Sequence, residues 1–227
     1  MGRRFAELAF TPAVQEQQRR HGSRGSYERV ERSSDLGDRL GEDEREFVEE
    51  RDGFYMATVT ETGWPYVQFR GGSKGFVHVL DERTLGFADL RGNKQYISVG
   101  NLHEEDRVAL FFMDYRRQSR LKILGRVTIY EGSDEAEEWI ERLRVPSETT
   151  PAERAMLIRV EAFDWNCQQH IPPRYTESEL AEILMPMRVR MEELERENTR
   201  LRNAAPPRRL NHEGSGYCFS WVWSTTE

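Results

Sequence analysis

Cysteine is scarce in this sequence, since only Cys167 and Cys218 among the 227 residues are of this type. Two cysteines so far apart form neither a zinc cluster nor a disulfide framework, and they indicate a reducing, cytoplasmic location. Long apolar runs are also missing. The longest, Val108 to Met113, is much too short to span a bilayer, so no membrane segment is expected. The first residues contain no apolar signal-peptide core, which predicts that no secretory signal is present.

An excess of positive charge is absent as well. Lys and Arg number 33 against 40 Asp and Glu, and the net charge is -7. A broad nucleic-acid surface needs a basic face, so this balance argues against a nucleic-acid partner. Aromatic residues make up 11% of the chain, which favours a folded core over wholesale disorder.

Familiar catalytic motifs are missing too. The sequence has no Gly-x-Ser-x-Gly, no His-Glu-x-x-His, no P-loop and no Gly-x-Gly-x-x-Gly. The histidines have no metal-ligand spacing, so no metal site is expected; they are His21, His78, His103, His170 and His212. No residue is an evident general base, and the catalytic residues stay unassigned.

The chain divides into four segments by composition. Residues 1–45 are polar, with one short helix expected after Thr11-Pro12 and a solvated linker over His21 to Arg39. Residues 46–175 are rich in β-formers, and residues 176–203 have a helical heptad pattern. Residues 204–227 end in an aromatic stretch, Tyr217 to Trp223, whose alternate rings share one face and are expected to pack on a partner surface.

The central segment predicts a mainly β domain. Strands are expected at 54–60, 65–69, 75–80, 84–88, 107–114, 121–131 and 155–163. Helices are expected over Asn93 to Leu102 and after the cap Ser133. Strands at these short intervals suggest an antiparallel barrel or sandwich.

The heptad segment leaves two interpretations open. Its apolar positions alternate in spacings of four and three residues, with a lone Asn198 among them. An asparagine at such a position fixes register in paired helices. The segment is either an amphipathic helix packed on its own domain or a helix–helix contact in a dimer, and Pro186 would kink its first turns.

Two stretches of the chain carry most of the candidate chemistry. Gln68 to Gly75 holds three glycines and two cations, and Phe87 to Gln95 leads from a strand into a helix. A hairpin between them would bring Arg70, Lys74, Arg91 and Lys94 to one end, where a phosphate dianion fits. A plain pair of surface loops would explain the same composition.

Four segments together resemble the pyridoxamine 5'-phosphate oxidase-related family of FMN-binding split barrels. They are Gly63 to Gly72, Gly86 to Tyr96, Arg107 to Phe112 and Leu121 to Arg126, and the resemblance covers about 45–175. It implies a six-stranded antiparallel split β-barrel with flanking helices and a homodimer with FMN between the subunits. It further implies an FMN-dependent oxidoreductase that moves a hydride between flavin N5 and a small substrate or NAD(P)H.

The same resemblance implies a set of cofactor-binding residues. Gln68 and Arg70 would follow the flavin ring edge, and Ser73 and Lys74 would supply the first basic contact. The remaining implied positions are Ala88 and Asp89 beside the ring or ribityl chain, Arg91, Asn93, Lys94 and Gln95 at the phosphate, and Arg120 on a barrel strand. Trp165 to Arg174 resembles a stretch found in a bacterial branch of the family and would cap the site from the partner chain.

One departure from the family limits what the resemblance implies. The segment that recognises pyridoxal phosphate in the true oxidase has no clear counterpart, because the heptad helix begins at Thr176 instead. Pyridoxamine phosphate is therefore not assigned as the substrate. Two other functions remain open: a flavin- or haem-binding protein without turnover, and a deazaflavin-dependent reductase.

Overall fold

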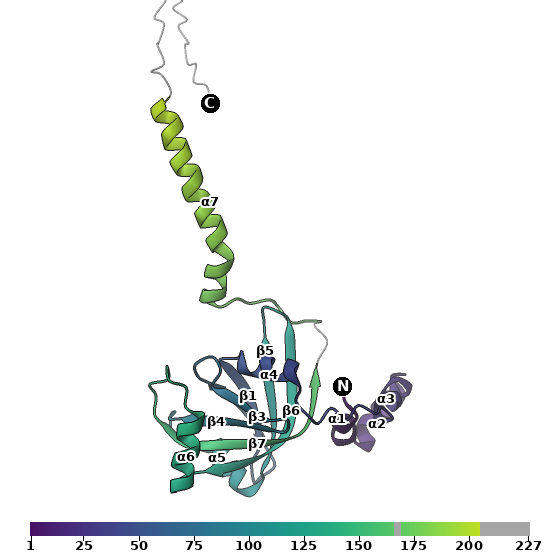
Figure 1. The fold of residues 1–227 in the computed structure, drawn as a ribbon. Coiled ribbons are helices and arrows are strands. Elements are labelled where there is room, and N and C mark those ends of the chain that lie inside the picture. The colour runs from purple at the N-terminus through teal and green to yellow at the C-terminus, as the bar shows by residue number, and fades with distance from the viewer. Residues whose placement is uncertain (166–168, 205–227) are drawn as a thin grey trace, which may run out of the picture. The chain divides into compact units, whose positions relative to one another are not determined.

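One antiparallel sheet of seven strands forms the centre of the computed structural model within the residues that the structure describes, 1–165 and 169–204 (Figure 1). The strands are β1 (Gly53–Val59), β2 (Pro65–Gly71), β3 (Val77–Asp81), β4 (Thr84–Leu90), β5 (Arg107–Asp114), β6 (Ser119–Tyr130) and β7 (Ala152–Trp165). Their order in the sheet is β2-β1-β5-β6-β7-β4-β3. The expected mainly β split barrel is confirmed. The resemblance implies six strands, whereas the described part of the chain has seven, one for each of the seven ranges expected from the strand pattern.

The core lies on the inner face of this sheet. Along β1, Phe54 and Met56 are fully buried, whereas Tyr55 between them is well exposed. The Phe54 ring stacks on Phe112 at 4.9 Å between centroids and meets the edge of Phe87 at 5.4 Å. Such ring pairs stabilise a core beyond their buried area. The alternation of side chains along a strand therefore decides which residues face the interior.

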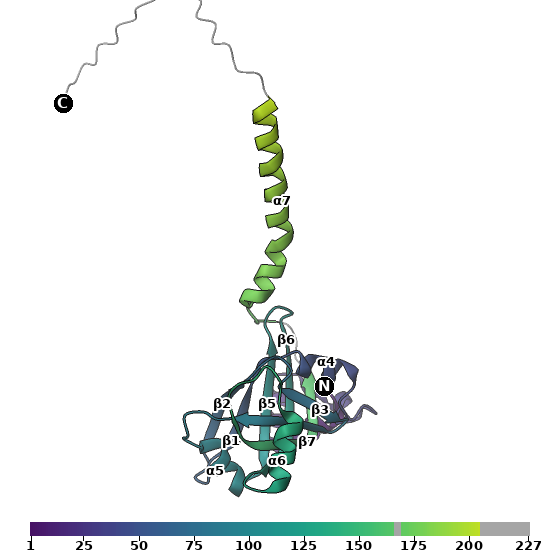
Figure 2. The ribbon, with the colours of Figure 1, turned by 60° about the vertical axis from the view of Figure 1, so that its left-hand side comes forward.

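Two helices lie at the same end of the sheet in both views of the ribbon (Figures 1 and 2). They are α5 (Ile97–Glu104) and α6 (Asp134–Leu143). Helix α6 begins as expected, since the Ser133 hydroxyl accepts a hydrogen bond from the Ala136 amide at 3.2 Å. Its Leu143 side chain packs against Ala88 and Ala155, so β4 and β7 are covered on their outer face as well.

The N-terminal segment is more structured than its composition predicts. Helix α2 (Pro12–Arg20) begins as expected, with Thr11 as its cap. The prediction of a linker over His21 to Arg39 is wrong in part, because helix α3 (Arg24–Glu31) forms within this stretch. Its first and last residues pair at 2.5 Å. Helix α1 (Arg3–Ala9) packs on β7 and α3, and α4 (Glu42–Glu49) packs on β3.

A second unit begins at Tyr175 and contains α7 (Glu177–Ala204), a helix of 28 residues that continues through Pro186. The expected C-terminal helix is therefore present. The expected aromatic stretch Tyr217 to Trp223 and both cysteines lie outside the described residues. Over the part of the chain that the structure describes, every helix is too short or too polar to cross a membrane.

The bulge between Leu124 and Gly125, where β6 pairs with β7, predicts a sharp effect of a single methyl group. A Cβ atom at Gly125 would lie 2.6 Å from the Arg159 carbonyl oxygen. We expect Gly125→Ala to lower the free energy of unfolding by about 1–3 kcal/mol, because the backbone must move. A Cβ at Gly100 in α5 meets nothing within 4 Å. The control Gly100→Ala should raise stability by about 0.5–1 kcal/mol in urea unfolding, and equal effects would contradict this account.

Candidate functional site

A cavity of about 300 Å³ lies between β2, β4, the loop after β4 and the start of β7. Seven of the eleven positions predicted from the sequence line it: Gln68, Arg70, Ala88, Asp89, Arg91, Asn93 and Lys94. The apolar part of the wall includes Phe76, Phe87 and Val99. The structure therefore brings two separate stretches of the chain around one space with a polar and an apolar side.

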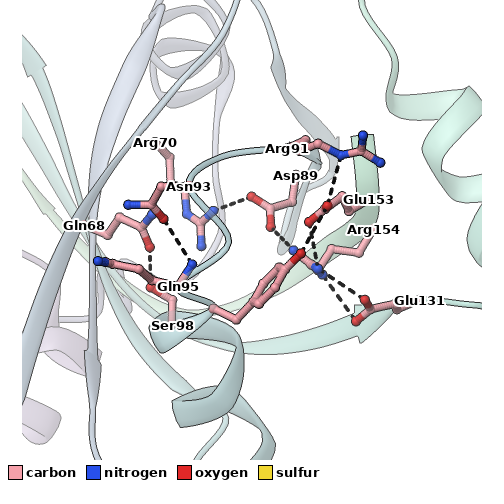
Figure 3. A network of polar contacts seen from close by, with 11 residues as sticks. Gln68, Arg70, Asp89, Arg91, Asn93, Gln95, Ser98, Glu131, Glu153 and Arg154 are labelled. Atoms are coloured by element: carbon pink, nitrogen blue, oxygen red, sulfur yellow. Dashed lines mark hydrogen bonds and ion pairs between the residues drawn. The ribbon is translucent and has the colours of Figure 1, made fainter. Parts of the chain in front are cut away.

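Two polar side chains of β2 point away from the exposed face of the strand, because successive side chains alternate between its two faces. Val67 and Phe69 are exposed, whereas the alternate residues Gln68 and Arg70 are partly buried. The Ser98 hydroxyl of α5 donates to Gln68 Oε1 at 2.7 Å. This bond connects β2 to the first turn of α5 and holds the amide of Gln68 in one orientation (Figure 3).

The carboxylate of Asp89 joins the partly buried guanidinium group of Arg70 to the buried guanidinium group of Arg154 (Figure 3). One oxygen forms an ion pair with Arg70, and the other accepts from Arg154 at 2.8 Å. The Asp89 and Arg154 side chains are only 3% and 5% exposed. Strands β2 and β4 are not neighbours in the sheet, since β2 is one edge and β4 lies next to the other. The pair of Arg70 with Asp89 therefore bridges the split in the barrel.

The guanidinium group of Arg154 connects this network to two glutamates. Arg154, directly opposite Asp89 in the β4–β7 ladder, pairs with Glu131 and with Glu153, each at 3.2 Å. Glu153 also accepts from Arg91 Nε at 3.2 Å and from the Tyr96 hydroxyl at 3.3 Å. The network thus extends from the buried Asp89 to the loop after β4, and it orients residues of β4, of β7 and of this loop.

Burial and neighbouring charge move the pKa values of the two buried arginines in opposite directions. Desolvation lowers the pKa of Arg70, and the nearby charge of Arg154 lowers it further against the pull of Asp89. Burial also opposes the charge of Arg154. Hydrogen bonds to Glu131 and Asp89 outweigh that burial and raise the Arg154 pKa. Arginine remains cationic in either case, so both groups stay positive at neutral pH.

One donor in this network has no partner. Arg70 Nε is buried and makes no hydrogen bond to any residue that the structure describes. Buried donors are nearly always satisfied in folded proteins, and an exception calls for an explanation such as strain or a bound water, ion or ligand. Arg70 lines the cavity, so an acceptor atom of a ligand there would satisfy its Nε. The residues of the cavity therefore fit a ligand that is both anionic and rich in acceptors.

The loop after β4 differs from the sequence prediction. The helix expected from Asn93 begins four residues later, at Ile97. Asn93 Oδ1 accepts from the Gln95 amide at 3.1 Å, a local bond that competes with helix formation. Lys94 and Tyr96 both have left-handed backbone, with φ of 61° and 52°. Such residues cost about 1–3 kcal/mol each and gather where a ligand is bound.

The other four predicted positions do not line the cavity. Ser73 and Lys74 lie in a turn that is held to the start of β1 by backbone bonds on either side, from Gly72 to Asp52 and from Gly75 to Arg51. Arg120 lies over the Phe111 ring at 5.9 Å, and Gln95 takes part only through its backbone in the turn above. A Cβ at Gly71 or Gly72 would meet an aromatic ring within 2.9 Å, so these glycines make room for Phe69 and Phe76.

Several lining residues escaped sequence analysis. Arg154 and Glu153 lie about sixty positions after the loop that follows β4 and about eighty after Gln68 to Gly75. Tyr96, Ser98 and Thr150 also line the cavity. The only signal for Arg154 is a cation next to an expected strand, which is common on protein surfaces. Trp165 to Arg174, expected to cap the site, is described only in part, because 166–168 lie outside the described residues. Within the described residues, no group of three or more His, Cys, Asp or Glu side chains suits a metal ion.

Comparison with known proteins agrees with this architecture. The family model described as "Pyridoxamine 5'-phosphate oxidase" matches residues 40–166, more than half of the chain. No curated protein matches the sequence. A Lactobacillus delbrueckii protein, provisionally named a pyridoxamine 5'-phosphate oxidase, is 20% identical with a TM-score of 0.44, over 56% of this chain and 94% of its own.

Two further solved structures are similar at lower identity. HupZ of Group A Streptococcus is 14% identical with a TM-score of 0.43, over 60% of this chain and 99% of its own. An FMN-binding protein of Syntrophomonas wolfei is 13% identical with a TM-score of 0.40, over 54% of this chain and 83% of its own.

The bridging carboxylate yields a stability prediction. Asp89→Asn removes the charge that lies between Arg70 and Arg154 while it keeps the side-chain shape. We expect a loss of about 3 kcal/mol in unfolding free energy, because Arg70 then loses its paired carboxylate and still faces Arg154, which keeps Glu131 and Glu153. The control is Asp106→Asn, whose pair with Arg126 is about half exposed. That change should cost less than about 1 kcal/mol. Equal losses in urea unfolding would refute the special role of Asp89.

Proposed function

The chain belongs to the pyridoxamine 5'-phosphate oxidase family, and from this premise we propose that it is an FMN-dependent oxidoreductase that works as a cytoplasmic homodimer. The proposed reaction transfers a hydride between flavin N5 and a small organic substrate or NAD(P)H. FMN, when bound, supplies the redox chemistry, and the protein binds it, orients it and tunes its electronics. The proposal names no particular substrate.

The observation that supports this proposal best is the charge of the cavity wall. Four lining residues are cationic and two are anionic: Arg70, Arg91, Lys94 and Arg154 against Asp89 and Glu153. Four minus two leaves a formal charge of +2 on the wall, in a chain whose net charge is -7. The phosphate of FMN is a dianion, and charge-assisted hydrogen bonds to arginine and lysine are the strong way to hold it.

We assign the phosphate end of the cofactor to the loop after β4. Lys94 lines the cavity and forms no ion pair with any residue that the structure describes. Its positive charge is therefore available to a ligand, whereas the charge of Arg91 is already shared with Glu153. The left-handed backbone of Lys94 and Tyr96 shapes this loop before any ligand arrives. Preorganised donors lose little entropy when they bind.

We assign the ring end to β2. Gln68 is oriented by Ser98, and Arg70 is held by Asp89 with its Nε unpartnered. A positive charge beside the ring carbonyl groups favours the uptake of electrons by the flavin. Asp89 keeps the guanidinium in place, and Arg154 in turn holds Asp89. In this proposal the chain itself binds, orients and polarises the flavin ring. No lining residue is assigned as a proton donor or acceptor.

The outer face of the barrel supports the homodimer. Val67 and Phe69 of β2 are 58% and 57% exposed, and Tyr55 and Phe111 continue the same face across β1 and β5. A groove of about 360 Å³ on this face has an almost wholly apolar lining. Exposed apolar faces of this kind mark contacts with another protein surface. We propose that a second copy covers it and that FMN lies at the edge of this contact.

Absorption spectroscopy of the purified protein tests the cofactor. A yellow protein with a flavin spectrum, or one that acquires it on titration with FMN, is expected. Loss of the flavin absorbance on addition of NADH without oxygen, followed by its return when oxygen is admitted, would show redox turnover instead of passive binding. A Soret band would mean haem, and reduction of a deazaflavin alone would mean the related reductase. A colourless protein that FMN does not change would overturn the proposal.

Charge reversal in the cavity tests the phosphate assignment. Lys94→Glu replaces attraction to the dianion by repulsion, so we expect FMN binding to weaken by about 10- to 100-fold, the value of one charge-assisted hydrogen bond. Lys74→Glu is the matched control, because Lys74 is also exposed and does not line the cavity. Fluorescence titration of FMN measures both variants. Similar affinities for the two would remove Lys94 from the phosphate site.

A further inference from the structure

Helix α7 has an apolar stripe that no other described residue of its own unit covers. The described part of this unit, residues 175–204, holds no second helix or strand, and no residue of α7 is buried. Met187 and Leu201 are each 62% exposed. A stripe of this length on a single helix is stable in water only when another apolar surface covers it.

The stripe has the spacing of a coiled-coil seam. Its members alternate in steps of four and three residues: Leu180, Leu184, Met187, Met191, Leu194, Asn198 and Leu201. In heptad notation the d positions begin at Leu180 and the a positions at Leu184. Pro186 then falls at a c position, on the side away from the seam. The proline ring therefore does not enter the contact, although it removes one backbone hydrogen bond.

We propose that α7 pairs with α7 of a second copy of this chain as a parallel, in-register, two-stranded coiled coil. The occupant is a second copy because the flanking charges complement themselves. In the parallel pair, Arg190 at g faces Glu195 of the partner subunit, and Glu197 at g faces Arg202 of the partner subunit. Each attraction occurs twice because of the two-fold symmetry.

Asn198 decides whether the two helices pair in parallel or antiparallel. The flanking charges do not decide this orientation, because they complement each other in both arrangements. In the parallel pair Asn198 lies opposite Asn198 of the partner subunit, and the two amides can donate to and accept from each other. In the antiparallel alignment that matches the same layers, Asn198 faces Met187 of the partner subunit. An amide buried against a thioether lacks a good partner, which disfavours that arrangement.

Disulfide trapping in the full-length chain tests this pairing. The background carries Cys167→Ser and Cys218→Ser, and Asn198→Cys is added at the a position. Mild oxidation should convert most of this protein into a covalent dimer, because of the two alignments compared above only the parallel in-register one brings position 198 against itself. The matched control is Thr199→Cys at the neighbouring b position, which points away from the seam. It should give several-fold less covalent dimer.

Two results would overturn the proposal. One is equal trapping at 198 and 199. The other is trapping between Met187→Cys and Asn198→Cys chains of different tags, which an antiparallel pair alone produces. If the protein is still a dimer by light scattering in the first case, the contact lies on the barrel and not on α7. This separates the helix pair from the proposed barrel dimer, and FMN titration of the same variants reports on the cofactor independently.

A second variant keeps the test independent of oxidation. Asn198→Leu removes the polar layer, so we expect a higher melting temperature of the helix signal together with a change in subunit number by sedimentation. Thr199→Leu serves as the control and should change neither. No difference between these two variants would contradict a seam at Asn198.

Discussion

The fold of the first unit depends on one buried carboxylate that compensates the charges of two guanidinium groups, one buried and one partly buried. Asp89 lies between Arg70 of β2 and Arg154 of β7, and almost no water reaches it. An open sheet has two edges that nothing in its hydrogen-bond ladder joins. In this sheet, the ion pair from β2 to β4 crosses that gap. Burying charged groups costs free energy, so this arrangement is stable only because Asp89 compensates the charges of both arginines.

The same network shapes the cavity beside it. Arg70 cannot turn away from the cavity while Asp89 holds it, and Asp89 is held in turn by Arg154. Glu153 extends this order to Arg91 and Tyr96 in the loop after β4. The charges that join the two sides of the split in the barrel are thus the same charges that line the cavity. In the proposed function this coupling orients the donors toward FMN before it binds, which lowers the entropic cost of binding.

Local patterns predicted much of the architecture because they act over a few residues. Alternation of apolar residues marked the strands, and Ser133 marked the start of α6 through its hydroxyl. The prediction was wrong where weak local signals compete. The charged stretch after His21 reads as solvent-exposed linker, yet α3 forms there with Arg24 and Glu31 paired across it. The helix expected at Asn93 begins later, because the Asn93 side chain bonds to its own loop.

The sequence by itself determined the strands, the heptad stripe of α7 and the two cationic stretches, since each is a property of neighbouring residues and of the period of a helix or strand. Only the tertiary structure decided which cations face the cavity. Lys94 lines the cavity and Lys74 does not, and a further cation, Arg154, comes from a strand about sixty residues further along the chain. The reason is that charge compensation in a buried site depends on distance in space, and strand pairing sets that distance between residues far apart in the chain.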